Sequence, residues 1–419
     1  MIRRLQLLLL GAVIVVAAFS TGLPFLFYLV YLGLLVVGGS YVLTRLGLSD
    51  LEAGYAVSQL SGHVGDRVKV TYTLRNTSRL PKPWLEVHNP TSLPAGLPGK
   101  ALGLAGRTER SWAVRMPLIR RGHFRVEPLQ IRTGDPFGFF ESAAAVGNGV
   151  SVVVYPRVEA LPLWRLPAAN LDGSHAMRER TLQTTPLATT VRPWAPGDAF
   201  NRIHWKSTAR HGDIQVKEFD LEQTADAWII LDLDRSVQEG FGDESTVESA
   251  IRVASSVSDS AIQENRAVGA TVGAHRLSQL PPDRGSRQRL KIMQLLAAVD
   301  GDGTTPLSET LIAAVPRIRR GMTVVVITPS VDRSWVKPLS TLRARGVACV
   351  VVWLDAAAYA AFAREERVRR GAAREEPEDE ATTSARRKAV RALRHALAEF
   401  DIRTYTVIPV RPLGELLVG

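Results

Sequence analysis

A stretch between residues 189 and 219 gathers the side chains best suited to chemistry or binding. It reads TTVRPWAPGDAFNRIHWKSTARHGDIQVKEF and contains Asp198, His204 and His211. One aspartate and two histidines can hold a metal or move a proton, but their irregular spacing matches no metal-ligand pattern. An aspartate after Pro-Gly is more typical of a helix cap, accepting from backbone N–H groups near Asn201. We therefore expect these residues to be structural or to bind a partner.

The same stretch interleaves cations with aromatic residues. Such cations can neutralise acids within the fold, face solvent, dock an acidic partner surface or bind phosphate. The aromatic neighbours and the chain reversal at Pro196-Gly197 favour the docking of an acidic partner surface. A charged face that only contacts solvent remains the alternative. The predicted partner-binding residues are Arg192, Asp198, Arg202, His204, Lys206 and Arg210. The predicted structural residues are Pro196, Gly197 and Trp205, the last as a core anchor.

These residues resemble the signature of the family called domain of unknown function 58. The signature has an arginine, an aromatic residue, P-G-D, R-x-I-x-W-K and A-R. It is matched by Arg192, Trp194, Pro196, Gly197, Asp198, Arg202, Ile203, Trp205, Lys206, Ala209 and Arg210. The resemblance implies an architecture but no reaction. Members are often encoded beside MoxR-type AAA+ ATPases and transglutaminase-like membrane proteins, which implies these partners and a role in assembly connected with the cell envelope.

Length and charge limit the classes of protein. The chain of 419 residues has room for two or three domains. Its formal net charge of +11 suits a nucleic-acid binder or a protein held at an anionic membrane face. No nucleic-acid-binding motif accompanies the charge, so we predict no specific nucleic-acid partner. Cys349 is the single cysteine, which excludes an internal disulfide and fits a reducing compartment.

The N-terminus predicts a membrane anchor. Residues 5–44 contain no Asp, Glu, Lys or Arg, which is enough for two spans, residues 5–19 and 25–43, around a turn at 20–24. Arg3 and Arg4 precede the first span and Arg45 follows the second, so both ends are predicted to be cytoplasmic. This makes the chain a multi-pass protein of the inner (plasma) membrane, with the lipid bilayer as a partner. A cleaved signal peptide is the rival interpretation.

Residues 49–158 predict an antiparallel β-sandwich, a domain that family members often carry before the signature. Residues 68–74 alternate apolar and polar side chains, the period of a half-buried strand. Asn76-Thr77-Ser78 fits a glycosylation pattern but is interpreted as a turn. The DPFGFF run at 135–140 also resembles the family. Further strands are expected at 112–116, 124–126, 129–131 and 150–155.

The rest of the chain predicts a linker and a second domain. Residues 159–188 are Pro-rich and irregular, and the signature segment covers 189–225. From residue 226 to 419, strands alternate with helices, which predicts a doubly wound sheet. Residues 364–387 carry many charges of both signs and are interpreted as a solvated helical insertion or a partly disordered loop. The strands are expected at 227–232, 268–272, 322–328, 347–354 and 403–408, and the helices near 247–261, 287–299, 307–318 and 390–400.

This α/β part resembles a von Willebrand factor A domain, which holds a metal above its sheet. Its ligands come from a D-x-S-x-S loop, a threonine in a second loop and an aspartate in a third. Here the third loop reads Thr328-Pro329-Ser330 and lacks the aspartate, and Arg235 adds a positive charge. We therefore predict no cofactor, with Mg²⁺ as the cation to test. The candidate ligands are Asp232, Asp234, Ser236 and Thr304.

These inferences give a multidomain fold: a transmembrane helical hairpin at 1–48, a β-sandwich, and a von Willebrand A-like domain preceded by the signature. The predicted function is that of a non-enzymatic, membrane-anchored adaptor facing the cytoplasm and working with a MoxR-type ATPase. One alternative is a metal-dependent hydrolase or transferase that uses the signature's Asp and His residues. Another is a binder of polyanions or of the membrane surface.

Overall fold

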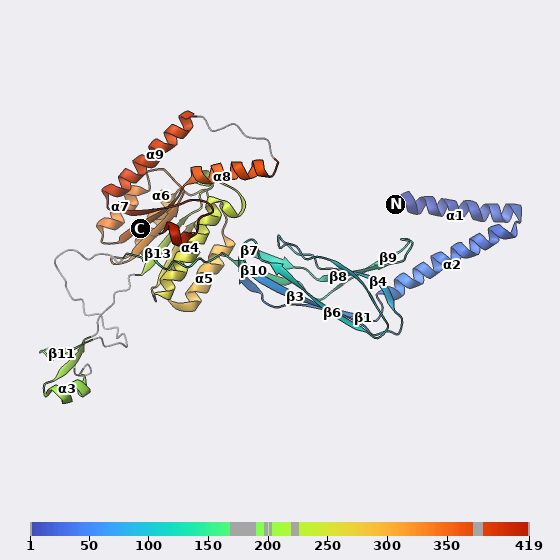
Figure 1. Ribbon diagram of the computed structural model, residues 1–419, viewed down its shortest axis with the longest axis horizontal. Helices are drawn as coiled ribbons and strands as arrows, with labels where there is room; N and C mark the ends of the chain where they lie inside the picture. The colour runs from blue at the N-terminus through green and yellow to red at the C-terminus, as the bar shows by residue number, and fades with distance from the viewer. Residues whose placement is uncertain are drawn as a thin grey trace. The chain divides into compact units, whose positions relative to one another are not determined.

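The protein folds as two compact units (Figure 1). The computed structural model describes residues 2–167, 190–196, 200, 203–218, 226–371 and 380–417. The first unit contains Met1–Val158 with Met293–Val299, and the second contains Glu159–Ile292 with Asp300–Gly419. The prediction of a multidomain chain is confirmed.

Two apolar helices begin the chain, α1 (Ile2–Thr21) and α2 (Pro24–Gly47). Gly22 separates them with a φ of 68°, and Pro24 starts α2, where its missing N–H costs no hydrogen bond. The rings of Phe19 and Phe27 meet edge to face, 5.4 Å between centroids. Among the described residues, α2 is the one helix long and apolar enough to cross a membrane, and the apolar part of α1, Leu9–Thr21, is shorter.

Three small sheets build the β domain of the first unit. Their orders are β1-β3-β6, β2-β10-β7 and β5-β4-β8-β9. Each described pair is antiparallel except β2 with β10, so the predicted antiparallel arrangement needs that one correction. The strands are β1 (Leu51–Val57), β2 (Ser61–His63), β3 (Arg67–Asn76), β4 (Lys82–His88), β5 (Lys100–Leu104), β6 (Glu109–Pro117), β7 (Gly122–Val126), β8 (Leu129–Gly134), β9 (Glu141–Val146) and β10 (Val150–Tyr155).

The three sheets share an apolar core. In β3, Val68, Val70, Tyr72 and Leu74 are buried, as their alternation predicts. The predicted break in the strand is confirmed, because β3 ends at Asn76. Asn76 is buried there, and its Nδ2 donates to the carbonyls of Leu80 and Ala105, at 2.8 and 3.0 Å. The buried amide thus holds the end of β3 to the loop before β4 and to the loop after β5.

A six-stranded sheet forms the centre of the second unit, in the order β15-β14-β13-β16-β17-β18. The described strands run parallel except β15, which is antiparallel to β14. β13, β14, β16 and β17 are buried along their whole length, which explains their continuous apolar sequences. The bounds are β13 (Ala227–Asp232), β14 (Val268–Gly273), β15 (Leu277–Asp283), β16 (Thr323–Thr328), β17 (Ala348–Leu354) and β18 (Arg403–Val407).

Helices cover both faces of this sheet. Trp228 and Ile230 of β13 share a core with residues of α6, α7 and α9. Because successive strand residues point to opposite faces, Ile229 and Leu231 face the other side, where α4 packs against β13. The helices are α4 (Thr246–Gln263), α5 (Gly285–Ala298), α6 (Leu307–Ala314), α7 (Val336–Ala344), α8 (Ala356–Arg369), α9 (Glu380–Glu399) and α10 (Leu413–Leu416).

Two segments that the sequence left uncertain have defined structure where they are described. The described part of the expected linker, 159–167, is anchored, because Trp164 and Leu166 are buried and the Trp164 ring meets Tyr405 at 6.3 Å. The charged insertion 364–387 is helical up to Arg369 in α8 and from Glu380 in α9, which agrees with the helical interpretation, and residues 372–379 lie outside the described residues.

Candidate functional site

The signature segment forms a small unit of two strands and one short helix. β11 (Thr190–Pro193) pairs antiparallel with β12 (Gln215–Glu218), and α3 (Trp205–His211) lies between them in sequence. Ile203 bridges to Val216, and α3 ends at Gly212, whose φ of 82° suits glycine. Among the described residues of this unit, the buried side chains are Ile203, Gln215 and Val216. The described residues of the unit therefore form a very small core.

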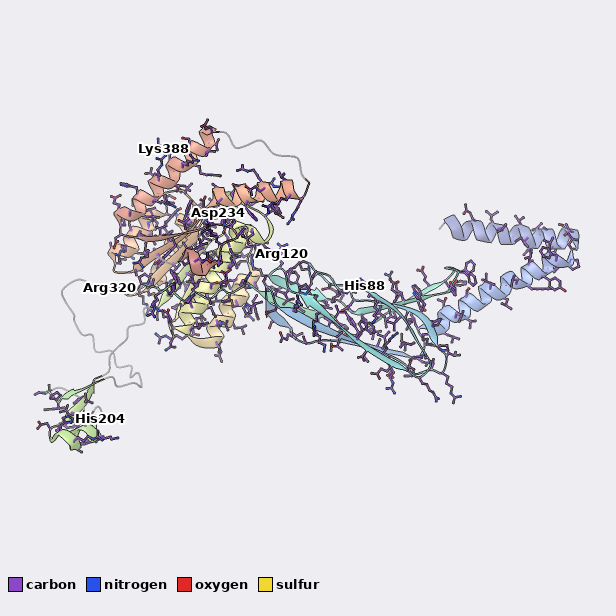
Figure 2. The ribbon with its side chains drawn as sticks, in the orientation of Figure 1. His88, Arg120, His204, Asp234, Arg320 and Lys388 are labelled. Carbon is purple, nitrogen blue, oxygen red and sulfur yellow. The ribbon has the colours of Figure 1, made fainter. Side chains whose placement is uncertain are left out.

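His204 is the cap of α3 (Figure 2). Its Nδ1 accepts from the Ser207 backbone N–H at 3.1 Å and lies 2.7 Å from the Ser207 hydroxyl oxygen. The His204 N–H donates to the Gln215 carbonyl at 2.8 Å, which ties the helix to β12. His211 donates from Nδ1 to the Ser207 carbonyl at 3.1 Å. Both imidazoles thus organise one helical turn. The predicted cap, Asp198, lies outside the described residues.

Trp205 is exposed, so the prediction that it anchors a core is wrong. Its side chain is 70% exposed, and that of Phe200 is 75% exposed. Ile203 and Val216 fill the small interior formed by the described residues. Trp205, in the first turn of α3, therefore lies on the surface. Two large aromatic side chains therefore face outward on a unit whose described residues bury only Ile203, Gln215 and Val216.

The structure places some of the predicted partner-binding residues close together. Lys206 and Arg210 are exposed on α3, next to Trp205, and His204 begins that helix. Arg192 lies in β11, where its backbone pairs with Val216. Pro196 is exposed in the loop after β11. Gly197, Asp198 and Arg202 lie outside the described residues.

A second candidate site lies at the carboxyl end of the central strand β13. Asp232 is 1% exposed, and its Oδ2 accepts from the Thr328 hydroxyl of β16 at 2.6 Å. Its Oδ1 accepts from the Asp234 backbone N–H at 3.1 Å. Burial raises the pKa of Asp232 to about 6, although these two hydrogen bonds act in the opposite direction. Open α/β sheets bind ligands at this edge.

The loop after β13 packs closely over the strand ends. Asp234, labelled in Figure 2, accepts from the Ser236 N–H at 3.0 Å, and the Arg235 N–H donates to the Gly303 carbonyl at 2.8 Å. A Cβ on Gly303 would lie 2.6 Å from the Gly273 carbonyl oxygen, so this approach requires glycine.

The structure brings Asp232, Asp234, Ser236 and the loop before Thr304 to one edge of the sheet. The side chain that bonds to Asp232 is Thr328, which the sequence analysis placed in the third loop but did not include among the candidate ligands. Among the described residues, no three His, Cys, Asp or Glu side chains are placed to hold a metal ion. One carboxylate is buried and bound to Thr328, and Mg²⁺ prefers several oxygen ligands in octahedral geometry. This donor set does not fit a tight Mg²⁺ site.

A third feature is a cleft rich in arginine, with a volume of about 530 Å³. Arg386 approaches Glu239 at 3.8 Å, and the Arg370 guanidinium lies 5.5 Å from the centre of the Phe241 ring. The sequence contains a signal for this cluster of arginines, because Arg364 and Arg367 are three residues apart and share one face of a helix. The cleft is lined by Glu239, Gly240, Phe241, Ala360, Ala363, Arg364, Arg367 and Arg386.

These sites fall within one family match. The model of the family described as "Protein of unknown function DUF58" matches residues 190–392, from β11 into α9. The match covers the signature unit, the Asp232 loop and the residues that line the arginine cleft. The resemblance inferred from the signature is therefore supported over this range.

Several uncharacterised bacterial proteins are similar. YeaD of Bacillus subtilis is 26% identical over 313 residues, which cover 72% of this chain and 75% of that protein. Rv1480 of Mycobacterium tuberculosis is 23% identical over 169 residues, covering 39% of this chain and 53% of that protein. A solved CARDB domain of Pyrococcus furiosus is 14% identical and covers 25% of this chain, with a TM-score of 0.19, which is too low to support an argument about fold.

Proposed function

We propose that this chain is a membrane-anchored, non-enzymatic adaptor whose signature unit docks a partner protein. The observation that carries the proposal is the exposure of Phe200 and Trp205 beside the cations Lys206 and Arg210. A two-stranded sheet is marginally stable alone, and chains below about 40 residues usually need further support. Tryptophan and arginine are also the residue types that most often dominate binding energy at interfaces.

The partner that fits this surface has an apolar pocket with acidic residues around it. Trp205 would fill the pocket, and Lys206 and Arg210 would set the docking register against carboxylates. The family resemblance suggests a MoxR-type AAA+ ATPase as this partner, together with a transglutaminase-like membrane protein. In this proposal the ATPase acts on a complex that the adaptor holds at the membrane, in a process of the cell envelope.

The proposed anchor is a transmembrane hairpin. Helix α2 supplies one span and α1 the other, and the flanking Arg3, Arg4 and Arg45 favour cytoplasmic ends. The chain would then be a multi-pass protein of the inner membrane with cytoplasmic domains. Reporter fusions at residues 45 and 419 test this orientation, and a periplasmic signal from either would contradict it.

We also propose that the second unit is a von Willebrand A-like domain. The supporting observations are the mixed sheet with one antiparallel edge strand and the Asp232–Ser236 loop at the carboxyl end of its central strand. In this proposal the loop is a degenerate form of a metal-binding loop, and the domain serves as a binding platform.

A pull-down from solubilised membranes tests the adaptor role. Trp205→Ala, and separately the pair Lys206→Glu and Arg210→Glu, should lose the co-purified ATPase while melting like the wild type. Ile312→Ala, which removes a comparably exposed side chain (60%) from α6, is the matched control and should keep it. Retained ATPase in the Trp205 variant, or early melting of the charge-reversed variant, would contradict the proposed surface.

Anion binding at the arginine cleft is a second candidate function. Its lining combines three arginines with one carboxylate in a volume typical of small-molecule sites. Guanidinium groups bind phosphate through paired hydrogen bonds. Calorimetry with tripolyphosphate should show binding that weakens with salt and is lost in Arg364→Gln. Binding unchanged in that variant, or absent from the wild type, would remove this candidate.

The hydrolase alternative gains no specific support. His204 and His211 both bond to Ser207, where they cap and close the short helix α3, and Asp198, the carboxylate of that alternative, lies outside the described residues.

A further inference from the structure

The loop between β8 and β9 exposes aromatic rings at the tip of a hairpin. Its sequence is DPFGFF, residues 135–140. Phe137 is 61% exposed and stacks on Phe139, with 5.8 Å between ring centroids. On the neighbouring strand β4, Trp84 is 44% exposed, and its carbonyl accepts from the Thr133 hydroxyl at 2.8 Å. Grouped apolar rings on a surface usually mark a contact site.

Asp135 holds this tip in one conformation. Its carboxylate accepts from the N–H groups of Phe137, at 2.9 Å, and Phe140, at 2.6 Å. Burial opposes the charge, but these amides, with that of Phe139 and the Ser40 hydroxyl of α2, lower the pKa of Asp135 below its usual value. The rings are therefore presented by a preformed loop that needs no rearrangement to bind.

The tip is also joined to α2. The ring of Phe140 meets Tyr41 of α2 edge to face, with centroids 5.6 Å apart. Ser40, Thr44 and Gly47, which share one face of the helix, are buried. Gly47 approaches so closely that a Cβ there would lie 2.6 Å from the Thr133 side chain. The last two turns of α2 thus pack against the β domain.

Lys82 strengthens this junction. It is 2% exposed, and its ammonium group donates to the Leu46 carbonyl at the end of α2 and, at 3.4 Å, to the Ser49 hydroxyl. Burial lowers the pKa of Lys82, and the nearby Asp50 charge acts in the opposite direction. Because no free linker separates the helix from the domain, the depth of α2 in a bilayer sets the depth of the loop.

Helix length places the loop at the membrane boundary. Tyr41 is 17 positions after Pro24 (41 − 24), a rise of about 26 Å along the helix axis. A hydrocarbon core is about 30 Å thick. If Pro24 lies at one boundary, Tyr41 and the adjacent Phe140 ring lie close to the other, where aromatic side chains are favoured.

We propose that the loop 135–140 inserts its phenylalanine rings, together with the ring of Trp84, into the lipid headgroup region on the side where α2 ends. The bilayer would then hold the β domain in one orientation, through the helix and the aromatic tip. Arg45, exposed in the last turn of α2, would meet anionic headgroups on the same side. This inference rests on the proposed crossing of α2 and adds a second membrane contact.

Spin labels on the full chain in lipid nanodiscs test the inference. A nitroxide is attached at Phe137→Cys, at Leu35→Cys in α2 and at Leu60→Cys, a control 57% exposed in the same domain. Cys349 is buried and burial raises its pKa to about 12, so the native thiol reacts little. Collisions with lipid-soluble oxygen should dominate at 137 and 35, and collisions with a water-soluble nickel chelate should dominate at 60.

The outcomes separate the two proposals. Dominant nickel collisions at 137 with dominant oxygen collisions at 35 would overturn the aromatic contact and leave the crossing of α2 intact. Dominant nickel collisions at both positions would overturn both. If the labelled 137 variant melts below the wild type, a label at Pro136→Cys, exposed on the same tip, replaces it and is judged by the same outcomes.

Discussion

Trp205 and Trp228 lie in regions that use the same side chain in opposite ways. Trp228, in the central strand β13, is fully buried, and its indole N–H donates to the Thr271 hydroxyl at 3.0 Å. Gly269 makes room for its ring, because a Cβ there would lie 2.7 Å from it. Trp205 faces outward on a unit whose interior holds few side chains. Burial therefore depends on how many elements surround a residue, and two strands with one short helix provide too few.

The largest expected effect tests this contrast directly. Trp228→Ala should cost about 3–5 kcal/mol, whereas Trp205→Ala should stay within about 0.5 kcal/mol. For a domain of this size the first change lowers the melting temperature by roughly 6–20 °C. Thermal melts of the full chain in detergent measure both. Equal melting temperatures for the two variants would show that Trp205 is buried in the native protein.

A smaller effect concerns Asp232, the buried carboxyl at the end of the same strand. Its folded pKa, about 6, lies above the ordinary 3.8, so the folded state binds the proton more tightly. Its contribution to stability is therefore complete below about pH 4 and is lost as the pH rises through 6, a loss of about 3 kcal/mol. Asp232→Asn should remove this loss.

Urea unfolding at a series of pH values measures the Asp232 effect as the difference between variant and wild type. Thr328→Val provides a sharper comparison, since its hydroxyl lowers the pKa of Asp232 and its removal should move the wild-type transition to higher pH. A difference between Asp232→Asn and the wild type that does not change with pH would contradict the assignment.

The smallest expected effect is Mg²⁺ binding at this loop. Two carboxylates, one of them bound to Thr328, should give a dissociation constant no tighter than millimolar. Calorimetry on the full chain decides the point. Micromolar affinity that disappears in Asp232→Ala would show that the loop still assembles a metal site, and the second unit would then bind through the cation.

The sequence predicted what depends on continuous burial. The apolar runs of β13, β14, β16 and β17 each gave a strand, because both faces of these strands are covered. Strand β15 was missed, since two prolines interrupt it, a composition that an edge strand tolerates.

Other features depend on neighbours that are distant in sequence. Helix α7 was missed because only Val336, Leu339 and Leu342 form its buried face, and polar residues with a proline fill the rest. For the candidate sites, the signature motif located the exposed unit but not the direction in which Trp205 points. Similarly, the contact between Asp232 and Thr328 joins two strands 96 positions apart, which no local pattern reveals.

The strand order of the second unit has a consequence for synthesis. β13 is made first, yet it occupies the centre of the sheet and pairs with β16, which begins at Thr323. At ribosomal rates of about 5–20 residues per second, the side of β13 that awaits β16 stays unpaired for about 5–20 s. During that interval AWIILD is an exposed apolar edge that can pair with another chain. In the proposed membrane anchoring, the nascent chain is inserted through α1 and α2 before β13 is made, and its separation from neighbouring chains would limit this aggregation until β16 arrives.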